Sequence, residues 1–165
     1  MRKALTIAGE HDAAAIAALQ NAAAAELTRR FGYGRWSSVA TEKSVRFYMR
    51  QASVYIARDR RRIVATLTLT EKKPWAIDRK RLTPVKRPLY LIGMAVDPAR
   101  QRAGVGRACI AAAMKIVKKC PADSLCLDAY DADAGAGDFY RKCGFTEVGR
   151  ADYKGAALIY FELLV

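Results

Sequence analysis

Histidine and cysteine are scarce in this sequence of 165 residues. There is one histidine, His11, and the four cysteines never form a CxxC pair. Zinc sites in proteins are usually built from such side chains at short, regular spacings, so we expect no metal site. The cysteines fall within expected helices and strands rather than in a loop framework, which indicates reduced, packed thiols; they are Cys109, Cys120, Cys126 and Cys143.

Long apolar runs are also missing. No stretch reaches the roughly 18 residues that a membrane span needs, and the first residues lack the apolar core of a secretory signal. We therefore expect a cytoplasmic protein without a membrane partner. The length fits a single domain over residues 1–165, which is long enough to bury a core without disulfides or metal.

Acidic residues are outnumbered, with 16 Asp+Glu against 29 Lys+Arg and a formal net charge of +13. Such an excess attracts polyanions in general, including nucleic acid, ribosomes, anionic lipid and phosphorylated cofactors. The sequence has no RNP-like motif and no basic surface interleaved with aromatics, so nucleic acid is not the expected partner. Between Glu71 and Pro88 the excess is highest, with Lys72, Lys73, Arg79, Lys80, Arg81, Lys86 and Arg87.

Hydrophobic periodicity predicts the element order β α α β β β α β α β β. Strands are expected at residues 5–8, 53–57, 63–70, 89–96, 124–128, 145–148 and 157–164, with helices at 12–31, from 41, from 104 to about 118, and at 136–142. The second helix would carry Val45, Tyr48 and Met49 inward. The turn containing Arg58, Arg60, Arg61 and Arg62 is expected to be solvated.

Two of the expected strands differ in polarity. Residues 63–70 alternate between an apolar series, Ile63, Ala65, Leu67 and Leu69, and a series rich in threonine, which is typical of a strand buried on one face. Residues 89–96 are apolar at both odd and even positions, which is typical of a central strand buried on both faces.

The stretch VDPARQRAGVGRACI follows this central strand and opens a helix. A dinucleotide-binding fingerprint needs a third glycine, but Cys109 stands in that position, and no GxxxxGK[ST] phosphate loop is present. Two interpretations remain. Free amides at a helix N-terminus can bind a phosphate that glycine allows to approach, or the glycines can serve turn geometry alone.

The segment from Gln101 to Gly106 resembles the Gln/Arg-x-x-Gly-x-Gly/Ala motif of the GNAT superfamily of acyl-CoA N-acyltransferases. The segment FYRKCGF, from Phe139 to Phe145, is similar to the Phe-Tyr-x-x-x-Gly-Phe segment of that family. The resemblance implies an α/β fold with a mixed, mainly antiparallel central sheet, helices on both faces and a splayed cofactor cleft. It also implies transfer of an acetyl group from acetyl-CoA directly to a primary amine.

By the same resemblance, the pyrophosphate of acetyl-CoA lies on the backbone of the loop and helix start, and its pantetheine arm pairs with the central strand. The implied loop residues are Arg102, Ala103, Gly104, Val105, Gly106 and Arg107, and the implied strand residues are Met94, Ala95 and Val96. The backbone N–H near Met94 is the implied donor to the oxyanion. Since an amine attacks the thioester directly, Cys126 and Cys143 are expected to be structural.

Tyr140 lies where this family places its general acid. A phenol with a pKa of about 10 stays protonated at neutral pH and can donate to a thiolate whose acid has a pKa of about 8.5. The alternative is an aromatic side chain packed beside Phe139. Asp128 precedes Tyr140 by 12 residues. This is the spacing of base and acid in ribosomal-protein N-terminal acetyltransferases, whose base is a glutamate, so the resemblance implies that Asp128 is the base. An equally good interpretation is that Asp128 caps the end of a strand. Asp133 departs from the asparagine of those relatives.

The acceptor side is expected to include Tyr33, Arg35 and Trp36 of GYGRW and Trp75 of the basic connection. A solvated charged loop with a packed tryptophan is the alternative. If these residues face the site, arginine and lysine favour an acceptor that carries a carboxylate or phosphate beside its amine. A small molecule and a peptide N-terminus both fit as acceptors. The sequence is also compatible with a homodimer. The rival functions are transfer of another acyl group and a non-catalytic protein of this fold that contacts RNA or the ribosome.

Overall fold

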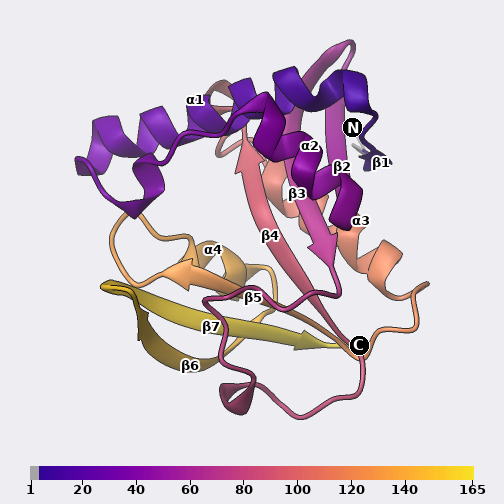
Figure 1. Cartoon of the computed structure of the whole chain (residues 1–165), viewed down its shortest axis with the longest axis vertical. Helices are drawn as coiled ribbons and strands as arrows, with labels where there is room; N and C mark the ends of the chain where they lie inside the picture. Colours follow the sequence, from indigo (N-terminus) through magenta and orange to yellow (C-terminus); the bar gives the residue numbers. More distant parts are fainter. Residues whose placement is uncertain (1–3) are drawn as a thin grey trace.

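A seven-stranded sheet in the order β1-β2-β3-β4-β5-β7-β6 runs through the molecule (Figure 1). The structure is a computed structural model that describes residues 4–165. Neighbouring strands are antiparallel except β4 and β5, which are parallel. The strands are β1 (Thr6–Ile7), β2 (Ser53–Asp59), β3 (Arg62–Thr70), β4 (Pro88–Val96), β5 (Ser124–Tyr130), β6 (Thr146–Tyr153) and β7 (Ala156–Leu164). The element order is the predicted one, and the mixed, mainly antiparallel fold class is confirmed.

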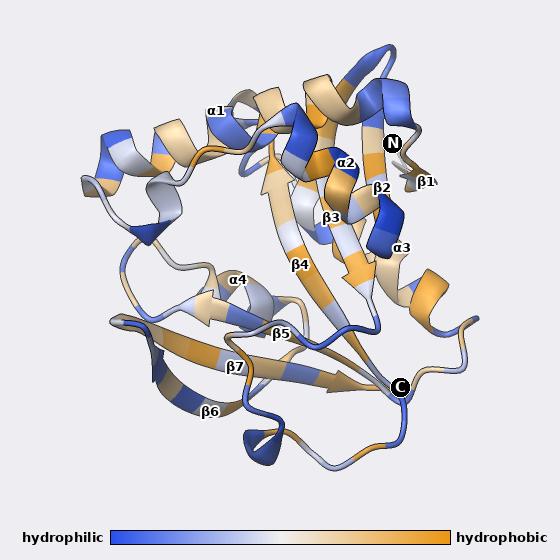
Figure 2. Ribbon diagram, in the orientation of Figure 1, coloured by the Kyte–Doolittle hydropathy of each residue, from blue (hydrophilic) through white to orange (hydrophobic). Residues whose placement is uncertain are grey.

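Helices cover both faces of this sheet. They are α1 (Ala13–Phe31), α2 (Glu42–Gln51), α3 (Val105–Val117) and α4 (Gly137–Lys142). α1 and α2 bury Ile16 and Val45 against β2 and β3. On the other face, α3 buries Cys109 and Ala113 with residues of β3, β4 and β5. Figure 2 shows apolar stretches along these strands and along α3. None of the helices within residues 4–165 is long and apolar enough to cross a membrane.

The basic connection between β3 and β4, residues 71–87, is attached to the sheet by an apolar cluster of its own. Ile77 and Leu82 are buried in it against Tyr90, Cys126 and Tyr160. The Tyr160 hydroxyl donates to the carbonyl of Ala76 and accepts a hydrogen bond from the Asp78 amide at 3.3 Å. The apolar cluster and these hydrogen bonds therefore hold the connection, with its polar residues, in place against the sheet. Figure 2 shows the connection largely in blue, the colour of hydrophilic residues.

β4 and β5 pair only at their beginnings. Pro88, Leu89 and Tyr90 lie opposite Ser124, Leu125 and Cys126. Beyond this point β4 pairs with β3 and β5 pairs with β7, and the two strands diverge from their meeting point near the C-terminus (Figure 1). Within residues 4–165, each strand thus has one edge without a neighbouring strand.

This divergence overturns two expectations about burial. β4 is not buried throughout: Tyr90 and Leu91 are its only buried residues. β3 is not a one-faced strand, because every residue after Arg62 is buried. The reason is long-range, since the second half of β4 has no neighbouring strand on one edge, whereas β3 lies between two strands and beneath helices on both faces.

A β-bulge bends β4 where it leaves β5. Thr66 lies opposite Ala95, and Thr68 lies opposite Ile92, so β4 has one residue more than β3 over this interval. Gly93 lies within the bulge and has a φ of 60°, a conformation that residues with a Cβ rarely adopt. A bulge increases local bend and twist, and here it helps to turn β4 away from β5.

The arginine turn between β2 and β3 is not simply solvated. The Arg58 guanidinium pairs with the carboxylate of Asp12, and Arg62 pairs with Asp97 at 2.8 Å. Both carboxylates are buried. Although burial alone would raise it, the pKa of Asp12 lies below its usual value because the Gly9 amide and Arg58 donate hydrogen bonds to the carboxylate. The turn thus neutralises two buried acids.

Candidate active site

The open half of β4 faces α4, which carries the residue expected to be the acid. The Tyr140 hydroxyl lies 3.9 Å from the sulfur of Met94, the residue after Gly93. The Tyr140 ring is 7% exposed and packs edge-on against Phe139 and Phe145, with ring centroids 5.2 and 5.7 Å away. The hydroxyl therefore lies against the half of β4 that has left β5, while the ring is held in the core.

The environment of Tyr140 keeps its hydroxyl protonated. Burial raises the pKa of Tyr140 strongly, and the negative charge of Asp128 and the nearby Cys143 raise it further. Within residues 4–165, the hydroxyl donates to the thioether of Met94, which is a weak acceptor. The proton is thus present at neutral pH, as a proton donor requires.

Asp128 lies in the half of β5 that pairs with β7 alone, opposite Tyr160. Burial raises the pKa of Asp128 above its usual value. Its carboxylate forms no salt bridge with any residue in the described part of the chain, so no cation offsets the cost of its charge. A carboxylate in this setting is a stronger base than one in water. Its charge raises the pKa values of Tyr130 and Tyr140, so it lies near both phenols.

The loop before α3 presents backbone amides. Arg102 and Gly104 have φ values of 62° and 77°, and the first hydrogen bond of α3 runs from the Ala108 amide to the Gly104 carbonyl at 3.0 Å. The amides of residues 105–107 therefore have no partner within the helix. The side-chain amide of Gln101 donates to the Val96 carbonyl at 3.2 Å, which ties the loop to the end of β4.

Gly106 allows α3, β4 and α4 to meet. A Cβ added at Gly106 would lie 3.2 and 3.3 Å from two ring atoms of Phe139 and 3.6 Å from the Met94 methyl group. The structure thus brings together three sequence segments expected to form the cofactor site: the end of β4, the loop with the helix start, and the FYRKCGF segment.

Two of the four residues expected on the acceptor side lie near the end of β5. The Arg35 guanidinium donates to the carbonyl of Lys154 in the β6–β7 turn. The Trp36 ring packs edge-on against Tyr130, with centroids 5.8 Å apart, and its N–H donates to the Gly32 carbonyl at 3.0 Å. Since Tyr130 follows Asp128 by two residues, Arg35 and Trp36 reach the same end of the cleft as this carboxylate.

The other two do not join them. Tyr33 is 89% exposed and Trp75 is 83% exposed. Tyr33 borders a shallow hollow beneath the second half of α1, whereas Trp75 lies in the connection between β3 and β4.

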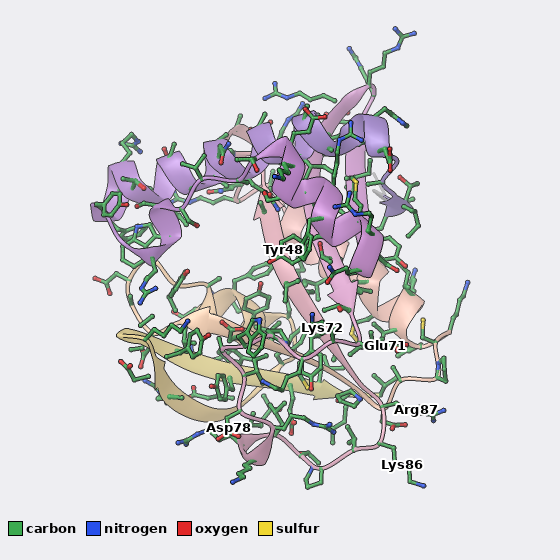
Figure 3. The ribbon with its side chains drawn as sticks, in the orientation of Figure 1. Tyr48, Glu71, Lys72, Asp78, Lys86 and Arg87 are labelled. Carbon is green, nitrogen blue, oxygen red and sulfur yellow. The ribbon has the colours of Figure 1, made fainter. Side chains whose placement is uncertain are left out.

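Tyr48 was not expected at a site, and its predicted inward orientation is wrong. It is 48% exposed and extends from α2 over β4 (Figure 3). There it borders a cavity of about 190 Å³ whose lining includes Gln20, Thr68, Ile92 and Gly93. The helical spacing of Val45, Tyr48 and Met49 is typical of a buried stripe. This pattern contains no information about the bulge in β4, whose Gly93 lines the same cavity as Tyr48.

The cysteines near the cleft have protonated thiols. Cys126 is buried beside Ser124, with 3.4 Å between sulfur and oxygen, and burial raises the pKa of Cys126 and of Cys143. Neither thiol is thereby prepared as a nucleophile, since the thiolate is the reactive form. Residues 4–165 contain no group of three or more His, Cys, Asp or Glu side chains that could hold a metal ion.

Comparisons with known proteins show the family and the fold of this chain. The model of the acetyltransferase (GNAT) domain matches residues 50–147, more than half of the chain, whereas no curated protein sequence gives a significant match. A GCN5-related N-acetyltransferase from Rhodopseudomonas palustris has a TM-score of 0.74 and 21% identity, covering 100% of this chain and 97% of that chain. At this level of identity the likeness shows the fold.

Two further solved structures share the fold. A ribosomal-protein-alanine N-acetyltransferase from Brucella melitensis has a TM-score of 0.72 and 15% identity, covering 98% of this chain and 99% of that chain. A Salmonella typhimurium protein solved with its cofactor acetyl-CoA has a TM-score of 0.71 and 15% identity, covering 99% of this chain and 94% of that chain.

Proposed function

This chain belongs to the GNAT acetyltransferase family, and from this premise we propose that it transfers an acetyl group from acetyl-CoA to the primary amine of an acceptor. The observation that carries the proposal is the divergence of β4 and β5 after three paired residues. It leaves two strand edges facing a cleft that is bordered by the start of α3 and by the hydroxyl of Tyr140.

The residues around this cleft fit acetyl-CoA. The amides at the start of α3 are free for phosphate oxygens, and Arg102 and Arg107 add positive charge there. The edge of β4 from Met94 to Val96 is available for an extended chain to pair with it, and the lack of a side chain at Gly106 lets the start of α3 lie close to Phe139 and Met94. When bound, acetyl-CoA supplies a thioester that a neutral amine attacks directly.

We assign the proton transfers to two side chains. Asp128, whose pKa is raised by burial, accepts the proton that the acceptor amine loses, directly or through one water. Tyr140, whose pKa is raised by burial, donates a proton from its hydroxyl to the departing sulfur. The backbone N–H of Met94 donates to the acyl oxygen. Positioned acids and bases of this kind each contribute rate factors of about 10² to 10⁴.

We propose that the acceptor enters from the side of Arg35 and Trp36. The contacts of Arg35 with Lys154 and of Trp36 with Tyr130 support this route, with Tyr33 and Trp75 as outer contacts. The positive charge on this side favours an acceptor with a carboxylate or phosphate group. We also propose a cytoplasmic location, because Cys120, Cys126 and Cys143 are free thiols and free thiols are typical of reducing compartments.

An acceptor screen tests the proposal. Thiol release from acetyl-CoA is measured with amines, amino acids, polyamines and peptides, and then repeated with succinyl-CoA and longer acyl-CoAs. We expect turnover with acetyl-CoA and at least one amine, and a higher melting temperature in acetyl-CoA alone. If acetyl-CoA gives neither turnover nor a shift, and RNA binds with an affinity that falls steeply with salt, the rival binding function replaces ours.

A further inference from the structure

A second cavity lies at the closed end of the cleft, where β4 and β5 still pair. Its volume is about 470 Å³, and it lies between the β3–β4 connection, the first residues of β4 and the turn before β5. Its polar lining residues are Glu71, Lys73, Arg79, Lys86, Arg87 and Tyr90. Figure 3 shows Glu71, Arg87 and Lys86 on one side of the molecule, around the beginning of β4.

The charge of this cavity is strongly positive. Four basic side chains and one acidic side chain line it. Arg87 is partly neutralised by Asp123 at 3.3 Å. Lys73, Arg79 and Lys86 form no salt bridge with any residue in positions 4–165: Lys73 donates to the carbonyls of Pro74 and Ile77, and Arg79 donates to the carbonyl of Val85. Lys73, Arg79 and Lys86 therefore share one hollow whose lining contains a single acidic side chain, Glu71.

Tyr90 adds a buried hydroxyl to the same cavity. It lines the cavity and is 1% exposed. Its hydroxyl is the one buried side-chain polar atom of the described chain that has no hydrogen-bond partner. Burying such a group without a partner costs free energy, and a group of this kind in a native protein calls for an explanation. A ligand oxygen at this position would provide the missing partner.

We propose that this cavity binds a small molecule that carries a phosphate group. The volume falls within the range of about 300 to 1,000 Å³ that is common for small-molecule sites. Lysine and arginine side chains form strong, charge-assisted hydrogen bonds with phosphate oxygens. A hollow of this size, lined by Tyr90 and several cations, suits a compact anion, whereas a nucleic acid backbone needs an extended positive groove.

The site is separate from the proposed acetyl-CoA site. Tyr90 precedes Met94 by four residues along β4, which corresponds to about 13 Å at the usual rise of a strand. The ligand would instead contact Pro88, Leu89 and Tyr90, the only residues of β4 that pair with β5. It would thus join the basic connection to the closed end of the cleft.

Binding of inorganic phosphate and pyrophosphate tests this site, measured by calorimetry at fixed ionic strength. We expect the double variant Arg79→Gln/Lys86→Gln to weaken binding by at least about tenfold, because charged hydrogen bonds are lost. The control Lys72→Gln/Lys80→Gln removes the same charge from the same connection, outside the lining, and should change affinity less than about twofold. Tyr90→Phe should weaken binding without lowering the melting temperature of the free protein.

The outcomes separate this site from other sources of anion affinity. Equal weakening in both double variants would mean that diffuse charge attracts the anion, which overturns the proposal. So would weakening only in Arg102→Gln/Arg107→Gln, since the anion would then lie at the start of α3. Absence of binding to the wild-type protein, or unchanged affinity in Tyr90→Phe, also contradicts the site as described.

Discussion

The hydroxyl of Tyr140 lies 3.9 Å from the sulfur of Met94. This contact joins α4 to the half of β4 that has left β5, so the phenol reaches the cleft at the residue after the bulge. Burial raises the pKa of Tyr140, and the thioether accepts only a weak hydrogen bond. The hydroxyl is thus protonated and available at the point where the thioester is proposed to lie.

Replacing Tyr140 by phenylalanine removes this proton while retaining the ring. We expect kcat for thiol release to fall by about 10² to 10⁴. The melting temperature should change little, because the ring keeps its packing and the hydroxyl loses only a weak partner. Stopped-flow or steady-state thiol detection measures the rate, and thermal unfolding measures the stability.

Tyr153→Phe is the matched control, because it removes a phenol hydroxyl from β6 outside the cleft. It should retain the wild-type rate. A Tyr140→Phe enzyme that also retains it would assign the proton to water and leave Tyr140 as a packed aromatic residue.

Asp128→Asn tests the cost of the buried carboxylate. Burial raises the pKa of Asp128 in the folded state, so this group favours folding most at pH values below its unfolded pKa. That contribution is lost as the pH rises through the folded pKa, where the charged form must be buried. At about pH 7 the variant should therefore unfold at a higher temperature than the wild type, and the difference should shrink toward about pH 4.

The same substitution should reduce activity. The asparagine cannot accept a proton, so kcat should fall by about 10² to 10⁴, and the acidic limb of the pH–rate profile should disappear. A variant that is both less stable at neutral pH and fully active would show that Asp128 has only a structural role within β5.

Local patterns in the sequence predicted much of this protein. The element order, the glycines at the start of α3 and the position of Tyr140 depend on periodicity and short motifs, which neighbouring residues determine. The opposite burial of β3 and β4 was predicted wrongly, because it depends on where β4 leaves β5. That point is determined by the bulge at Gly93 and by partners far away in the chain.

The cavities were beyond prediction for the same reason. The orphan hydroxyl of Tyr90 and the cations of residues 71–87 come together only because Ile77 and Leu82 attach the connection to the sheet. Tyr48 has the spacing of a core residue, yet it extends over the cleft side of β4. In both cases the sequence contains the residues, but only tertiary packing determines which surface or cavity their side chains face.

Gly106→Glu should abolish the response to acetyl-CoA. A side chain here would meet the ring of Phe139 from its first carbon onward, and its negative charge would repel phosphate from the free amides of α3. We expect acetyl-CoA to raise the melting temperature of the wild type and to leave that of the variant unchanged. Gly155→Ala, at a φ of 81° in the β6–β7 turn with open space around it, should lower stability but keep the shift. Equal shifts in all three proteins would place the cofactor elsewhere.

The ion pair of Arg58 with Asp12 should contribute to stability. Arg58→Met leaves a buried carboxylate with the Gly9 amide as its main partner, so we expect a loss of about 1–3 kcal/mol at neutral pH. Because the folded pKa of Asp12 lies below its usual value, the contribution exists above the unfolded pKa and is lost as the pH falls through the folded one. Chemical unfolding at several pH values measures it.

Arg61→Met is the control for this pair, since it removes a nearby arginine whose side chain forms no salt bridge with residues 4–165. Its effect should stay within about 0.5 kcal/mol. Equal effects of the two variants would mean that the turn responds to its net charge rather than to this pair.

Trp36 should determine affinity for the acceptor rather than for acetyl-CoA. Its ring holds the α1–α2 connection against Tyr130, two residues beyond Asp128, so Trp36→Ala releases that connection from the end of β5. With the amine found in the screen, we expect its KM to rise by about tenfold, in line with the loss of an aromatic contact and its packing, while the KM for acetyl-CoA stays unchanged. Trp36→Phe keeps the edge-on contact and should restore most of the affinity. A rise in the KM for acetyl-CoA, or no rise for the amine, would move the acceptor to another face of the cleft.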